Sequence, residues 1–176
     1  MEEITVFEEK QTKRQAKRTR YVAPRYSCVH LKFLTDFMAA TEMTVKEFAG
    51  GSMSANVALR RQLQNDEMLL SKAKELLENH GYKLTVKLND KNPDPKTAHV
   101  AIILDLPQIK TQNENVGFIF DLAKRRKLTE NQLAEKLGLS PGAIWAWKRV
   151  DDIKISYLYL IKDTLDCELE FRIEKA

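Results

Sequence analysis

The chain has 176 residues, 43% of them apolar and 31% charged, which are ordinary values for one globular domain or two small ones. No apolar run approaches the roughly 20 residues of a membrane span, and two cysteines far apart in the sequence form neither a CxxC pair nor a disulfide framework. These values exclude a membrane-spanning protein, a disulfide-stapled secreted domain and a largely disordered chain. Because residues 1–10 are acidic and lack the apolar core of a signal peptide, we expect a cytoplasmic protein with no membrane partner.

A basic segment precedes the first apolar pattern. The net charge of +4 comes almost entirely from residues 10–25, which hold seven Lys and Arg and no acidic residue. The segment lacks helical apolar spacing, so residues 1–30 are predicted to be an extended arm. It is either a solvated tail or an arm that follows DNA phosphates or the minor groove. In the second case, the contacting residues are Lys13, Arg14, Lys17, Arg18 and Arg20.

Residues 31–88, the first unit, are predicted to form four helices closed by a strand. An apolar stripe over 33–38 predicts the first helix, and the capping box Thr44-x-x-Glu47 starts the second. Gly50-Gly51 stands where the second helix would end. Residues 52–63 can form a third helix with Leu59 and Leu63 on its core side. A fourth helix over 71–79 leads into a strand over 83–88, where apolar residues alternate.

The linker, residues 89–115, begins with turn-forming Asn, Asp and Pro residues and then becomes apolar. Residues 98–106 are apolar on both faces, which is typical of a strand buried on both sides. We expect this strand to pair with 83–88 and also with 168–173, so that it holds the two halves of the chain in a pseudo-twofold relation. The alternatives are a local hairpin or pairing across a homodimer interface.

Residues 116–176, the second unit, repeat this order with clearer boundaries. An apolar stripe over 118–123 predicts the first helix, and the capping box Thr129-x-x-Gln132 starts a second helix that ends at Gly138. Ser140-Pro141 then starts a third helix at once, so two short helices flank a turn, as in a helix-turn-helix. A fourth helix over 156–165 and a strand over 168–173 complete the unit.

The two units are related by one constant shift along the sequence, the repeat offset, which places Thr44 over Thr129. Residues 43–49 then lie over 128–134, and the alternating apolar residues of 84–88 lie over those of 169–173. The alignment places one missing residue in the first unit near Gly51, restored before Met68. Apolar positions match where identities are few, which indicates an old duplication of a unit of about 57 residues rather than a solenoid.

The sequence 128–149 resembles the helix-turn-helix of the Cro and lambda-repressor type of DNA-binding domain, and the likeness covers about residues 116–165. The residues at that family's spacing for helix packing, turn and recognition-helix core are Ala134, Gly138, Ile144 and Trp147. The resemblance implies a mainly α fold with a small β-sheet. Two lambda-repressor-like units would each end in a strand and be joined through a further strand, and many bacterial members end in such a strand.

Two features depart from the family pattern. Glu130 stands where the family often has Gln, and Lys148-Arg149-Val150 replaces the usual Glu-x-Gly. In such proteins the outward residues at the start of the recognition helix face base edges in the major groove. In the second unit these are Ser140, Gly142, Ala143, Trp145 and Ala146, with Lys148 and Arg149 near phosphates. Trp145 would contact a thymine methyl group or the sugar–phosphate edge, or else cover a neighbouring element or a partner surface.

The first unit offers a second set of contacts. The residues predicted there are Ser54, Asn56, Arg60, Arg61 and Gln64. Asn56 would pair with adenine, and Arg60 or Arg61 would meet guanine or phosphate.

Other functional classes lack support in the sequence. The three histidines match no zinc spacing, and the chain has no GxGxxG, no P-loop, no HExxH and no GxSxG. Asp151-Asp152 is expected to lie solvated in a loop. We therefore expect no enzyme, cofactor, metal or small-molecule ligand.

These features predict a sequence-specific double-stranded DNA-binding transcriptional regulator that acts as a repressor or activator by occupying its site. The alternative is a protein-interaction module on a helix-turn-helix scaffold that has lost its DNA surface. The paucity of strong base-reading residues supports the alternative, whereas the basic arm and the two copies oppose it. A homodimer remains open.

Overall fold

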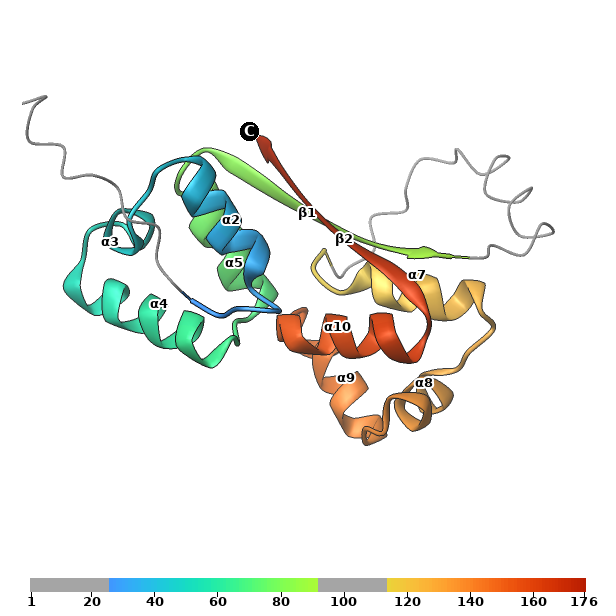
Figure 1. Ribbon diagram of the computed structural model, residues 1–176. Coiled ribbons are helices and arrows are strands. Elements are labelled where there is room, and N and C mark those ends of the chain that lie inside the picture. Colours follow the sequence, from blue (N-terminus) through green and yellow to red (C-terminus); the bar gives the residue numbers. More distant parts are fainter. Residues whose placement is uncertain (1–25, 92–113) are drawn as a thin grey trace, which may run out of the picture.

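The computed structural model describes residues 26–91 and 114–176 (Figure 1). The first unit contains α2 (Lys32–Ala40), α3 (Val45–Phe48), α4 (Met53–Asn65), α5 (Leu70–Glu78) and β1 (Tyr82–Asp90). The second unit contains α7 (Gly117–Arg125), α8 (Glu130–Leu137), α9 (Pro141–Val150), α10 (Ile155–Thr164) and β2 (Cys167–Lys175). Within the described residues, these eight helices and one two-stranded sheet confirm the expected class, mainly α with a small β-sheet. None of these helices combines the length and apolar character needed to cross a membrane.

The helix starts predicted from sequence are present in both units. The Thr44 hydroxyl accepts a hydrogen bond from the Glu47 amide at 3.3 Å, and the Glu47 carboxylate accepts one from the Thr44 amide at 2.8 Å. Thr129 and Gln132 repeat these two bonds at 3.3 and 2.9 Å. α8 ends at Gly138, whose φ of 67° lies in the left-handed region that favours glycine. The predicted capping boxes and the helix stop are therefore confirmed.

The two units differ in their middle helices. α3 has 4 residues and α8 has 8, whereas α4 has 13 and α9 has 10. The capping boxes and the C-cap residues Asp66 and Asp151 nevertheless keep the same repeat offset. The offset is therefore the same on both sides of the segment between Gly51 and Met68, where the sequence alignment placed a missing residue and its restoration. Relative to the second unit, the first has a shorter second helix and a longer third one, joined by Gly50 and Gly51 with φ of 82° and 80°.

Each unit buries equivalent positions in its own core. In each unit three surfaces are buried. They are the apolar stripe of the first helix (α2 or α7), one side of the third, recognition-type helix (α4 or α9) and the inner side of the fourth helix (α5 or α10). The buried pairs that share the repeat offset are Leu34 and Ile119, Phe37 and Leu122, Phe48 and Leu133, Leu59 and Ile144, Leu70 and Ile155, and Leu76 and Ile161. Because the same positions are buried in both units, the duplication inferred from sequence is also a duplication of packing.

The sheet joins the two units directly. β1 and β2 are antiparallel, and Val86 lies opposite Phe171, its own equivalent at the repeat offset. On either side of this pair, Leu84 lies opposite Ile173 and Leu88 opposite Leu169. A pseudo-twofold axis therefore passes between Val86 and Phe171. Figure 1 shows the two strands crossing. The linker strand expected over 98–106 lies outside the described residues.

A second crossing lies on the same axis. Leu69 and Lys154, another equivalent pair, form an isolated antiparallel bridge. The amide of Leu70 donates to the carbonyl of Ile153 at 2.8 Å, and the amide of Ile155 donates to the carbonyl of Met68 at 2.9 Å. These reciprocal bonds join the segments just before α5 and α10. Two separate crossings on one axis fix the relative orientation of the units.

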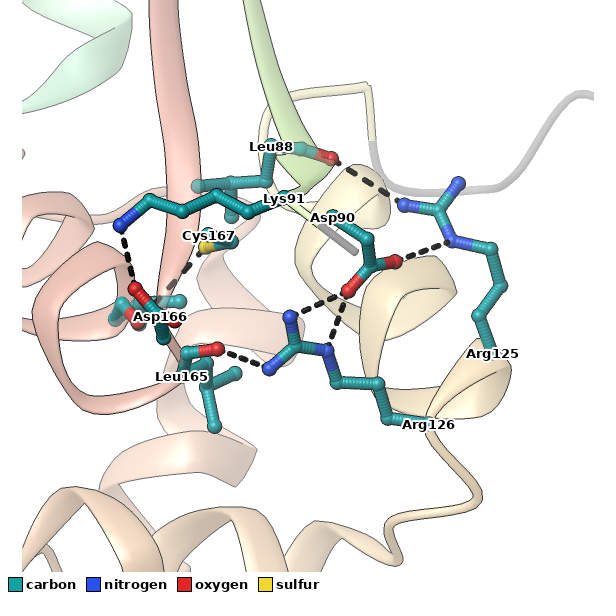
Figure 2. A network of polar contacts seen from close by, with 9 residues as sticks. Leu88, Asp90, Lys91, Arg125, Arg126, Leu165, Asp166 and Cys167 are labelled. Atoms are coloured by element: carbon teal, nitrogen blue, oxygen red, sulfur yellow. Dashed lines mark hydrogen bonds and ion pairs between the residues drawn. The ribbon is translucent and has the colours of Figure 1, made fainter. Parts of the chain in front are cut away.

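One end of the sheet carries an ionic clamp (Figure 2). The Asp90 carboxylate, 18% exposed, accepts a hydrogen bond from Arg126 Nε at 2.6 Å, and Arg125 Nε lies 3.8 Å from its other oxygen. Arg126 also donates to the carbonyl of Leu165, and Lys91 Nζ lies 2.5 Å from Asp166 Oδ1. The clamp ties the end of β1 to the α7–α8 corner and to the α10–β2 turn of the second unit. At the pseudo-equivalent end, Ala40 and Thr41 replace the two arginines.

Candidate nucleic-acid interface

α9 presents a face opposite to its core side. Ile144 is fully buried, and Trp147 is 8% exposed with its ring centre 5.2 Å from that of Tyr157 on α10. Trp145 is 56% exposed, and the Arg149 guanidinium lies 4.9 Å from the centre of its ring. Ile144 and Trp147 are therefore core residues and Trp145 is an exposed one, as the sequence predicts. The stacked cation gives the face an aromatic and basic end.

Not every predicted residue of the second unit is available on this face. Lys148 Nζ lies 2.8 Å from Glu130 Oε1 and 5.5 Å from the centre of the Phe120 ring, so it ties α9 to α8 and α7. The Ser140 hydroxyl accepts a hydrogen bond from the Ala143 amide as the cap of α9. Ala143 and Ala146 are half-buried, whereas Gly142, Trp145 and Arg149 are exposed. Fewer residues are thus available on the outward surface of α9 than the sequence predicts.

α4 presents the matching face in the first unit. Leu59 and Leu63 are buried on its core side, as predicted. Arg60, Arg61 and Gln64 are exposed, and so is Ser54, whose hydroxyl lies 3.0 Å from that of Ser52. Asn56 is only 8% exposed, and its side-chain oxygen accepts a hydrogen bond from Arg60 Nε at 3.1 Å. The expectation that Asn56 presents its amide to adenine is wrong, because this amide is buried and orients Arg60.

The sequence reasoning missed an apolar part of α4. Met53 is 73% exposed and Val57 58% exposed, and with Ala58, Arg61 and Asn65 they line an open groove. The spacing of Met53 and Val57 at i and i+4, on a different side of the helix from Leu59 and Leu63, is the sequence signal that could have found them. The α4 surface is therefore a mixture of cations, amides and exposed apolar side chains.

Two aspartates hold the recognition-type helices against the rest of each unit. Asp66, just after α4, accepts hydrogen bonds from the amides of Val29, His30 and Leu31 at 2.9 to 3.1 Å. Asp151, just after α9, accepts from residues 114–116 at 3.0 to 3.3 Å. Both have positive φ, 52° and 51°, and the two are equivalent at the repeat offset. The carboxylates thus connect the end of α4 to the start of α2, and the end of α9 to the start of α7.

The environment of these aspartates corrects the expected solvated loop at Asp151-Asp152. Asp152 accepts hydrogen bonds from the Ser71 amide at 3.1 Å and the Ser71 hydroxyl at 2.5 Å, across the junction between units. For Asp66, burial alone would raise the pKa of the carboxyl, but the bonds from the amides of residues 29–31 and the nearby His30 ring hold it below its usual value. The acidic residues after the two helices are structural anchors.

The predicted arm residues Lys13, Arg14, Lys17, Arg18 and Arg20 lie outside the described residues. Within 26–91 and 114–176, no group of three or more His, Cys, Asp or Glu side chains is arranged to hold a metal ion. No protein-family model, no curated protein and no solved structure matches this chain.

Proposed function

We propose that the protein is a sequence-specific double-stranded DNA-binding regulator that places α4 and α9 in the major groove. The observation that carries the proposal is the local geometry of the second unit. α8, the left-handed turn at Gly138 and the Ser140-capped α9 form a helix-turn-helix whose second helix exposes Gly142, Trp145 and Arg149. A helix presented in this way fits the width of the B-DNA major groove.

Charge supports the proposal through the N-terminal segment and a few residues of the two helices. The described residues hold nearly equal numbers of basic and acidic side chains, so most of the excess positive charge of the chain lies in residues 10–25. Arg60, Arg61 and Arg149 are exposed on the outward faces of α4 and α9. In this proposal the arm supplies much of the salt-dependent attraction to phosphates, and the helices supply the preference for sequence.

The test is selection of binding sites from a random duplex pool at roughly 150 mM salt, where weak backbone binding is suppressed. The expected result is an enriched motif. Arg61→Ala and Arg149→Ala should each weaken binding to it, while Lys87→Ala, which removes an exposed cation from the sheet, should leave affinity within about twofold. Equal affinity of all three variants and the parent across a salt series would contradict the proposal.

A specific observation favours a second candidate, a protein-interaction module on the same scaffold. Four of the six large apolar side chains that are exposed among the described residues lie on the proposed DNA-facing helices: Met53 and Val57 on α4, and Trp145 and Val150 on α9; the other two, Val29 and Leu69, lie elsewhere. Exposed apolar groups of this kind also mark protein-binding surfaces. An absence of any enriched motif, with only salt-labile binding, would favour this candidate over DNA reading.

A further inference from the structure

The pseudo-twofold axis relates the outward faces of α4 and α9 position by position. The equivalent pairs at the repeat offset are Val57 and Gly142, Arg60 and Trp145, Arg61 and Ala146, and Gln64 and Arg149. The spacing within each helix is i, i+3, i+4 and i+7, which is one helical face. All of these residues are exposed except Ala146, which is half-buried. The two helices therefore present the same face, with different chemistry.

The direction of the two faces follows from the axis. A twofold rotation keeps the component of a vector along the axis and reverses the component across it. α4 and α9 both lie on the side of the molecule away from the sheet (Figure 1). Because the axis relates them, their equivalent faces point the same way along the axis, whereas the two helices run in opposite directions across it. B-DNA has local twofold axes perpendicular to its length, and elements related by such an axis meet half-sites in inverted orientation. A direct repeat would require two units related by translation, which the antiparallel register excludes.

The relation between the units is fixed by contacts of several kinds. Besides the sheet and the bridge that precedes α5 and α10, Ser71 bonds to Asp152, and Lys74 Nζ donates to Asn115 Oδ1 at 2.6 Å. At the position equivalent to this last contact, the rings of His30 and Tyr159 meet edge to face with centres 5.0 Å apart. Because both junctions are packed, the distance between the reading faces is set by the fold. The half-sites then need one preferred spacing, and we expect about one helical turn, the usual separation of twofold-related recognition helices.

Charges on the strands favour pairing of β1 with β2 over pairing of either strand with its own copy in a second chain. β1 carries Lys83 and Lys87, which lie opposite Glu174 and Glu170 of β2. Pairing β2 with a second β2 in the same register would place Glu168 opposite Glu174 twice and Glu170 opposite Arg172 twice, so attraction and repulsion would balance. Pairing β1 with a second β1 would leave both lysines opposite uncharged residues. Like charges across a ladder are destabilising, whereas opposite charges stabilise it. In the structure β1 and β2 of one chain make this pair, so a single chain supplies both halves of the pseudo-dimer.

We propose, resting on the DNA-binding function above, that one chain binds an inverted repeat whose two half-sites differ in sequence. The half-site under α4 meets Arg60, held by Asn56, together with Arg61 and Gln64, the side-chain types that donate to guanine and adenine edges. The half-site under α9 meets Trp145 with Arg149 stacked on it, which offers an apolar surface for a thymine methyl group and a cation for a phosphate. The protein thus binds its site in one orientation only.

The test starts from the motif selected with the full chain. Duplexes carry its half-sites inverted, as a direct repeat, singly, or inverted with about 5 base pairs inserted, which turns one half-site to the opposite face of the DNA. The expected result is a complex of one chain per inverted duplex, with affinity at least about 100-fold lower for the other three duplexes. Binding of the direct repeat or the single half-site as tightly as the inverted one, or two chains per duplex, would overturn the inference and leave the proposed function standing. A selection that enriches no motif would overturn the proposed function itself.

Variants assign the half-sites. Arg61→Ala should relax base preference in one half-site only, and Trp145→Ala in the other only, while Lys87→Ala should change neither. Loss of preference in the same half-site for both Arg61→Ala and Trp145→Ala would overturn the assignment of one half-site to each helix.

Discussion

The carboxylate of Asp66 is predicted to be a main determinant of the stability of the first unit. Substitution Asp66→Asn keeps the size of the side chain and a residue type that tolerates the φ of 52° found there. It removes the negative charge that accepts hydrogen bonds from three successive amides, at 2.9 to 3.1 Å, in a side chain only 19% exposed. The amide group of Asn cannot replace both oxygens, because its NH₂ is a donor and would face a donor.

The expected loss of unfolding free energy at pH 7 is about 1–2 kcal/mol, from the worth of a helix cap and of hydrogen bonds to a charged group. For a chain of 176 residues this lowers the melting temperature by roughly 2–8 °C. The loss should depend on pH. The folded pKa of Asp66 lies below its usual value, so its contribution is complete above the unfolded pKa of about 3.9 and disappears as the pH falls through the folded pKa.

Urea denaturation followed by circular dichroism, repeated from pH 7 down to about pH 3, measures the difference between parent and variant. The matched control is Asp121→Asn, an exposed carboxylate on α7, with an expected effect within about 0.5 kcal/mol. The reasoning would be refuted by a difference at pH 7 no larger than that of the control, or by a difference that stays constant as the pH falls below the unfolded pKa of about 3.9.

Three further predictions concern the second unit and its junction. Arg126→Met should destabilise the fold by about 1–3 kcal/mol in urea denaturation, because it leaves the largely buried Asp90 without its closest cation. The control Arg172→Met, which breaks a half-exposed surface ion pair, should change the unfolding free energy by less than about 0.5 kcal/mol. Equal effects of the two variants would contradict the stabilising role of the ionic clamp. Trp147→Ala should cost about 3–5 kcal/mol and Trp145→Ala less than about 0.5 kcal/mol in the same assay, and the reverse order would mean that the core side of α9 is misassigned. Thr129→Ala should cost about 1 kcal/mol in thermal unfolding, with Thr129→Ser near the parent, since only the hydroxyl accepts the Gln132 amide.

The sequence by itself determined the local elements and their repetition. Capping boxes such as Thr44-x-x-Glu47, the Gly138 stop and the Ser140-Pro141 restart depend on bonds between residues three or four apart, so the letters alone predict them. The buried stripes of the helices follow the same short periodicity. The repeat offset, and with it the equivalence of the two units, can also be read from the sequence alone.

Only the tertiary structure decided how these elements meet. Three features show this: Val86 pairs with Phe171, Asp66 anchors residues 29–31, and Asn56 is buried. The first two depend on residues that are far apart in the chain, and the third depends on which side of α4 faces the core. No local sequence pattern specifies either. A carboxylate after a helix is equally compatible with solvent and with a set of amides until the fold brings those amides to it. Likewise, an asparagine on a predicted DNA-facing helix can read a base or can be buried and position another side chain. Turning the helix by one residue is enough to exchange these two roles. The pseudo-twofold axis, which orients the proposed interface, arises from long-range pairing and could be seen only once both strands were in place.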